Sequence, residues 1–167
     1  MVMTLAAPTA PTAPAATRRA TVAAVRNVLA AVHDPEIPTV SIVDLGLVHD
    51  IRVAPDGVRV ELLPTFVACP ALEVIRSIVF DALAVFDRPA DVSFTFAVPW
   101  TTDRLTPAGA AGLRKVGIAP PAQPSAVRCP FCDSGHVAID SLFGPALCRS
   151  LFYCRNCRQP FEAFKVI

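Results

Sequence analysis

The sequence predicts an α+β protein in which a small mixed three-stranded sheet with helices is followed by a small β module. Three observations support this fold class. Apolar residues repeat with a period of two in some segments and of three to four in others, and two CxxC pairs near the C-terminus enclose short β-type runs. The 167 residues suffice for one domain of about 100 residues and a smaller partner.

The composition argues against several classes of protein. A net charge of +1 is too small to favour nucleic acid or an acidic membrane as a partner. Charges or prolines interrupt each apolar stretch before it reaches the length that spans a bilayer. The N-terminus has neither the basic nor the apolar region of a secretion signal. We therefore expect a soluble, cytoplasmic protein, and the sequence leaves monomer and homodimer open.

The N-terminal third should contain a tail, a helix and an acidic loop. Residues 1–17 are almost entirely Ala, Pro and Thr, which predicts a disordered tail. Residues 18–33 should form an amphipathic helix, because apolar residues recur there at helical spacing. The loop at residues 34–48 contains two prolines and three carboxylates. Such a loop is expected to carry a site or a cap.

A hairpin and a helix should then position a single thiol. Residues 48–53 and 58–63 read as strands joined by a Pro-Asp-Gly turn. Cys69 is the only cysteine of the first 128 residues, and a helical pattern follows it. With Pro70 at the first helical position, Cys69 is expected at the N-cap, where the helix dipole favours the thiolate. The alternative is a buried, inert cysteine.

The rest of the first domain completes the order α-β-β-α-β-α. Residues 91–98 alternate as a strand, and Thr106-Pro107 should begin a last helix that ends at Gly117. The hairpin makes one strand pair antiparallel and the βαβ step makes another parallel, so the sheet is mixed. Prolines in residues 118–127 predict a stiff linker between this domain, residues 18–117, and the C-terminal module.

Residues 128–167 predict a zinc ribbon. Cys129-Pro-Phe-Cys132 and Cys154-Arg-Asn-Cys157 are separated by 21 residues, with β-type runs at residues 136–142, 150–153 and 161–166. Two such knuckles give a tetrahedral four-sulfur site that suits structural zinc. The metal would stabilise a segment too short to fold unaided. Rubredoxin-like iron is the alternative, because sulfur ligands accept either metal.

Cys148 and three histidines remain. His33 and His49 are expected to have structural roles. His136 follows a knuckle but is not needed as a ligand, since four cysteines suffice. Cys148 is expected to lie in the core of the ribbon. The alternative is that it presents a second sulfur toward Cys69.

Several motifs resemble those of a known family. Asp34-Pro-Glu-Ile-Pro, the run from Ser41 to Val48, Thr65 followed by Cys69-Pro, and Val98-Pro-Trp together resemble the SufT-type iron-sulfur assembly domain. Adding the ribbon, with Phe143-Gly144, Cys148 and Pro160-Phe161, makes the whole chain similar to the PaaD family, which supplies an accessory component of phenylacetyl-CoA epoxidase systems.

The resemblance implies a non-catalytic accessory protein of aerobic phenylacetate degradation. Its partners would be the oxygenase or reductase component of the epoxidase, whose di-iron centre or iron-sulfur cluster it would help to mature. It also implies that Cys69, Asp34 and Glu36 are the functional positions. We expect Cys69 to bind iron or a cluster transiently, with Asp34 or Glu36 as an oxygen ligand or proton acceptor, while the ribbon docks the client.

Two functions of other classes stay open. Cys69 is a candidate nucleophile of a thiol-dependent enzyme, with His33 or His49 as the base. Alternatively, the ribbon is a nucleic-acid-binding module. Its five basic and three acidic residues give a balance of +2, which is weak for binding dominated by phosphate contacts.

Overall fold

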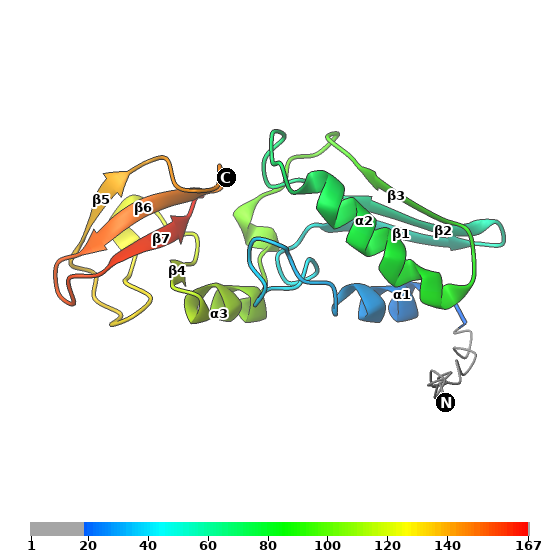
Figure 1. Cartoon of the computed structure of the whole chain (residues 1–167), viewed down its shortest axis with the longest axis horizontal. Helices are drawn as coiled ribbons and strands as arrows, with labels where there is room; N and C mark the ends of the chain where they lie inside the picture. The colour runs from blue at the N-terminus through cyan, green and yellow to red at the C-terminus, as the bar shows by residue number, and fades with distance from the viewer. Residues whose placement is uncertain (1–18, 167) are drawn as a thin grey trace, which may run out of the picture.

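The computed structural model describes residues 19–166, which form two sheets at opposite ends of an elongated molecule (Figure 1). The tail predicted at residues 1–17 lies outside the described residues. The first part of the chain contains α1 (Val22–Leu29), β1 (Val48–Ala54), β2 (Gly57–Leu62), α2 (Leu72–Leu83), β3 (Ala90–Phe94) and α3 (Pro107–Lys115). The second part contains β4 (Ile118–Ala119), β5 (Val137–Ser141), β6 (Arg149–Cys154) and β7 (Pro160–Phe164).

The first sheet has the strand order β1-β2-β3. β1 and β2 are antiparallel and β2 and β3 are parallel, which confirms the predicted mixed sheet. Val58, Val60 and Leu62 of the central strand are buried, and Arg59 between them is exposed. This alternation places one face of the sheet in the core and leaves the other in contact with solvent.

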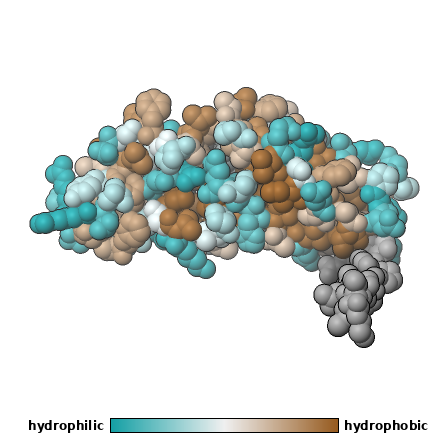
Figure 2. All heavy atoms as spheres, viewed as in Figure 1, coloured by the Kyte–Doolittle hydropathy of each residue, from teal (hydrophilic) through white to brown (hydrophobic). Residues whose placement is uncertain are grey.

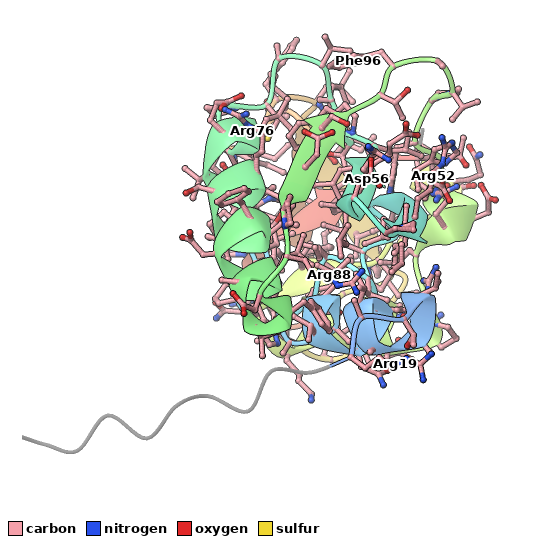
Figure 3. All side chains as sticks on the ribbon, turned by 90° about the vertical axis from the view of Figure 1, so that its right-hand side faces the viewer. Arg19, Arg52, Asp56, Arg76, Arg88 and Phe96 are labelled. Carbon is pink, nitrogen blue, oxygen red and sulfur yellow. The ribbon has the colours of Figure 1, made fainter. Side chains whose placement is uncertain are left out.

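Two helices cover the buried face. α1 packs against β1 and α2, and α2 packs against β3 (Figures 1 and 3). α2 turns Ile75, Val79 and Leu83 into the core. Its other side also carries exposed apolar residues such as Phe80, and Figure 2 shows apolar side chains gathered where α2 crosses the surface.

Two elements are shorter than expected. α1 begins at Val22 and ends at Leu29, inside the predicted range of 18–33. β3 ends at Phe94, because the Thr95 amide makes a last hydrogen bond to the Leu62 carbonyl and the chain then turns away. Phe96, inside the predicted strand range of 91–98, therefore lies 58 % exposed in the loop beyond the strand (Figure 3).

The second sheet has the order β4-β7-β6-β5. The three strands expected in the ribbon are confirmed as β5, β6 and β7. β4, however, lies in the segment expected to be a linker. Ile118 and Ala119 are buried and pair in parallel with Glu162 and Ala163 of β7. The start of the predicted linker is thus the edge strand of the ribbon sheet, since its two apolar side chains can be buried there.

The ribbon sheet packs against the first domain. Phe164 at the end of β7 joins the core cluster of the first domain, where its ring centroid lies 5.7 Å from that of Trp100. Trp100 itself is 2 % exposed, and its indole N–H donates to the Leu45 carbonyl at 3.0 Å. The two parts of the chain therefore share a continuous apolar contact.

The described helices are all too short, or too polar, to cross a lipid bilayer.

Candidate metal centre and thiol site

The four ribbon cysteines converge on one point. Their sulfur atoms all lie within 4.8 Å of one another, with Cys129 3.6 Å from Cys157 and Cys132 3.6 Å from Cys154. Sulfurs bound 2.3 Å from a tetrahedral ion stand about 3.8 Å apart. The geometry therefore fits one tetrahedral metal ion. Within residues 19–166 this is the only group of three or more His, Cys, Asp or Glu side chains with ligand atoms so close together.

The backbone of both knuckles presents the sulfurs in the same way. The residue after each second cysteine, Asp133 and Arg158, has a left-handed conformation with φ of 56° and 59°. The pKa of the Cys132 thiol is lowered to about 6, because the Asn156 side-chain amide and the Ser134 backbone amide donate to its sulfur. Such donors stabilise a thiolate, which is the form that binds metal.

Cys69 lies before α2 and does not occupy the N-cap predicted for it. The N-cap of α2 is Ala71, so Cys69 occupies a turn in which its own amide donates to the Phe66 carbonyl at 3.1 Å. Burial raises the pKa of the Cys69 thiol, and the carboxylates of Glu36 and Asp34 raise it further. The expectation that Cys69 caps the helix as a favoured thiolate is therefore wrong. Desolvation and negative charge outweigh the backbone amide of Ala71, which donates to the sulfur.

Cys69 nevertheless faces the acidic loop across two adjoining cavities. An inner cavity of about 20 Å³ is lined by Asp34, Glu36, Cys69 and Cys148, among others. An outer cavity of about 170 Å³ is lined by Glu36, Cys69 and Cys148 but not by Asp34. The inner cavity has room for about one water molecule or ion. The thiol and both predicted carboxylates thus border one space.

Asp34 also has a structural role. Its Oδ1 accepts hydrogen bonds from the amides of Glu36 at 2.8 Å and Ile37 at 3.0 Å, which fixes the turn at the start of the acidic loop. The side chain is buried, and this burial raises the pKa of the Asp34 carboxyl. Asp34 is therefore a turn cap that lines the site.

Glu36 is held by a residue that the sequence patterns did not reveal. Arg149, at the start of β6, is 8 % exposed and pairs with Glu36 at 3.4 Å and with Glu162 at 2.7 Å. It joins the ribbon to the acidic loop of the first domain. Arginine in a strand carries no local signal of burial, so only the packing of the two sheets could reveal this contact.

Cys148 does not lie in the core of the ribbon as we expected. It packs with the core of the first domain and lines both cavities together with Cys69. Its carbonyl accepts a hydrogen bond from the Lys165 amide at 2.9 Å, so Cys148 continues the pairing of β6 with β7, and its side chain is 9 % exposed. The alternative placement, toward Cys69, is therefore the one that the structure supports.

The third carboxylate of the acidic loop is structural. Asp44 accepts hydrogen bonds from the hydroxyls of Ser41 at 2.8 Å and Thr106 at 2.7 Å. Thr106 in turn caps α3 by accepting from the Gly109 amide at 3.0 Å. This network holds the acidic loop against α3 and leaves Asp34 and Glu36 as the carboxylates near the thiol.

The histidines lie elsewhere. His33 Nδ1 is 3.1 Å from the Ala31 carbonyl oxygen, and His49 is exposed on β1. Among the described residues, no histidine lines either cavity beside Cys69. His136 is exposed and is not a member of the four-cysteine group. The arrangement therefore provides no imidazole base for Cys69.

Two family models match different parts of the chain. Residues 22–96 match the model described as iron-sulfur cluster assembly protein. Residues 115–165 match the PaaD zinc beta ribbon domain, and this match includes β4 and all four clustered cysteines. The first match contains the sheet β1-β2-β3 and the second contains the sheet β4-β7-β6-β5, with residues 97–114 between the two matches.

Individual relatives agree with these matches. The chain is 37 % identical over 147 residues to an Escherichia coli K12 protein named as the D component of a "Putative 1,2-phenylacetyl-CoA epoxidase", covering 83 % of this chain and 89 % of the relative. It is 34 % identical over 85 residues to the Bacillus subtilis Fe-S protein maturation auxiliary factor YitW, covering 49 % of this chain and 82 % of that protein.

A solved structure resembles the first part of the chain. It is a DUF59 domain of unknown function from Bacillus anthracis, with a TM-score of 0.51 and 27 % sequence identity over 55 % of this chain and 89 % of that structure. Because a family model matches each module and one relative spans both modules, the chain belongs to the PaaD family, which joins an iron-sulfur cluster assembly domain to a zinc beta ribbon.

Proposed function

We propose that this protein is a non-catalytic accessory component of a phenylacetyl-CoA epoxidase system that delivers iron, or an iron-sulfur centre, to another component. The observation that carries the proposal is the half-buried Cys69 thiol, which borders a cavity lined by Asp34 and Glu36 in a domain of the iron-sulfur assembly family. The names of the Escherichia coli and Bacillus subtilis relatives support the same assignment.

The chemistry of the thiol suits transfer better than storage. Because the pKa of Cys69 is raised, its proton competes with metal at neutral pH and weakens binding. When Fe²⁺ binds, the S–H bond breaks, the sulfur bonds to iron and the proton passes to water. When client ligands take the ion, the thiol is reprotonated. Iron stays in one oxidation state throughout, so the step needs no redox partner.

The ribbon has a different role in this proposal. Cys129, Cys132, Cys154 and Cys157 hold a structural zinc ion, because four sulfurs at tetrahedral spacing form a closed site with no open position for cargo. The zinc stabilises β5 to β7, and the ribbon presents a surface to the oxygenase or reductase component.

Substitution of Cys69 tests this function. Anaerobically purified wild type should contain one zinc and, after exposure to Fe²⁺, one iron per chain, as measured by elemental analysis. Cys69→Ser should retain the zinc and lose most of the iron. In cells that carry only Cys69→Ser, epoxidase activity should fall to the level of cells without the gene.

A variant outside the site provides the control. Ser77→Ala removes a hydroxyl from α2, and Ser77 lines neither cavity beside Cys69, so it should behave as wild type. Normal epoxidase activity with Cys69→Ser would contradict the delivery role.

A further inference from the structure

The ribbon contributes a second thiol to the space that Cys69 borders. Cys148 belongs to the loop before β6, yet it packs into the core cluster of the first domain. Four residues line both the inner and the outer cavity and therefore lie where the two cavities meet, namely Glu36, Thr65, Cys69 and Cys148. Two cysteines from different modules therefore face the same space.

We infer that Cys148 is a second sulfur ligand for the iron cargo, so that the binding site is complete only when the ribbon is docked on the assembly domain. This inference rests on the proposed function of Cys69. The cargo would be one Fe²⁺ ion held by the sulfurs of Cys69 and Cys148, whose two protons pass to water on binding, with Glu36 as an oxygen ligand. Thiolate and carboxylate ligands together accept Fe²⁺.

The two cavities suit an ion that enters and leaves. The inner cavity, of about 20 Å³, has room for about one ion or water molecule. The outer cavity, of about 170 Å³, is lined by the loop residues Gly144 to Cys148 on one side and by Phe66, Cys69 and Pro70 on the other. The outer cavity therefore lies between the two modules.

Arg149 links the second thiol to the carboxylate. Arg149 directly follows Cys148 in the chain, and its guanidinium pairs with Glu36 at 3.4 Å and with Glu162 at 2.7 Å. The Nε atom of Arg149 is buried and has no hydrogen-bond partner among the described residues. Arg149 is thus a positioning residue that keeps Glu36 and Cys148 at the same boundary.

The local charge also favours a cation. Asp34, Glu36 and Glu162 provide three carboxylates around Arg149, the one cationic side chain that pairs with Glu36 or Glu162 within residues 19–166. The ligand atoms of Cys69, Cys148 and the Asp34 or Glu36 carboxylate lie farther from one another than the sulfurs of the four ribbon cysteines do. The site is therefore an open set of ligands, as a transfer site requires, and not a closed cage.

Iron K-edge absorption spectroscopy tests this inference directly. Zinc-loaded wild type receives one equivalent of Fe²⁺ in an anaerobic, thiol-free buffer, and the number of sulfur neighbours of iron is measured. Because the spectrum is specific to iron, sulfurs bound to zinc do not contribute. We expect two sulfurs for wild type and one for Cys148→Ser. Competition with an Fe²⁺ chelator should show that Cys148→Ser weakens binding at least about tenfold, since even outer partners of metal ligands contribute that much.

A matched variant controls for disturbance of β6. Ser150 is buried and its hydroxyl donates to the Ala163 carbonyl at 3.3 Å, so Ser150→Ala perturbs the same segment without removing a sulfur. It should retain two sulfurs and wild-type affinity. Zinc content and Trp100 fluorescence confirm folding of each variant, and the sulfur count of wild type does not depend on any substitution.

The outcomes separate this inference from the proposed function. The role of Cys148 would be overturned by a single sulfur neighbour of iron in wild type. It would also be overturned if Cys148→Ser had the same affinity and sulfur count as wild type. In either case the proposed function would stand as long as Cys69→Ser loses iron. If Cys69→Ser binds iron as well as wild type does, the proposed function fails, and this inference fails with it.

Discussion

At the scale of single residues, burial decides the protonation of the groups around the cavity. Asp34 and Cys69 both have raised pKa values, and desolvation is the largest cause for each. The protein tolerates these groups because each also accepts hydrogen bonds, Asp34 from two backbone amides and Cys69 from that of Ala71. The same side chains therefore support the local backbone and remain available to a cation.

Substitutions of Asp34 separate its two roles. Asp34→Ala leaves the amides of Glu36 and Ile37 without their acceptor and should lower the free energy of unfolding by about 2 kcal/mol. Asp34→Asn retains an oxygen at the same place and removes a buried charge, so at pH 7 it should be at least as stable as wild type. Urea denaturation of the three proteins measures the differences.

The pH dependence of the free energy of unfolding tests the raised pKa of Asp34. Because the folded-state pKa of Asp34 lies above its unfolded value, ionisation destabilises the folded protein at neutral pH. This penalty disappears as the pH falls through the folded and then the unfolded pKa. Wild type should therefore gain stability relative to Asp34→Asn on acidification, and a relative loss would contradict the raised pKa.

At the scale of elements, close packing of α3 fixes the acidic loop. Gly109 and Gly112 face the loop so closely that a Cβ atom would lie 2.6 Å from the carbonyl oxygens of Asp44 and Thr39, respectively. The Thr39 hydroxyl also donates to the Gly112 carbonyl at 2.8 Å. The glycines of this helix are therefore explained by contact and not by flexibility.

Gly109→Ala tests this packing. Helix propensity alone would make alanine more stable by about 1 kcal/mol. The clash with the Asp44 carbonyl should reverse the sign and destabilise the protein by about 1–3 kcal/mol, as overpacking does. Thermal denaturation measures the change. Ala111→Gly, at an exposed position of α3, is the control for propensity and should cost about 1 kcal/mol. A more stable Gly109→Ala would show that the loop moves away freely.

At the scale of the whole molecule, the ribbon is a folded unit that also lines the cavities beside Cys69. Phe164 packs on Trp100, Cys148 lines the cavities and Arg149 pairs with Glu36. Each of these three contacts comes from the part of the ribbon sheet nearest the first domain. Unfolding of the ribbon should therefore change the structure of the thiol site.

Removal of the ribbon metal tests this coupling. The chain contains one tryptophan, Trp100, which is 2 % exposed and contacts Phe164. A strong chelator should unfold β5 to β7 and shift the Trp100 emission to longer wavelength, because the indole loses part of its cover. The first sheet has its own core, so much of the circular dichroism should remain. Zinc should restore the original emission. An unchanged emission after complete metal loss would mean that the docked contacts survive without the metal.

Much of this architecture could be predicted from local patterns. The alternation around Val60 identifies a strand, the Thr106-Pro107 pair begins a helix, and the two CxxC pairs identify the metal ligands, because each of these signals acts within a few residues. The start of α2 was misplaced by two residues, because the turn before it also contains a proline. β4 was missed, because two residues carry too little pattern to identify an edge strand.

The sequence by itself determined the two modules, the order of their elements apart from β4, the four sulfurs of the ribbon and the family of the chain. Only the tertiary structure decided that Cys148 and Cys69 border the same cavities, that Arg149 holds Glu36, and that burial raises the pKa of the Cys69 thiol. The physical reason is that these properties depend on burial and on contacts between segments far apart in the chain. Local propensity contains no information about either.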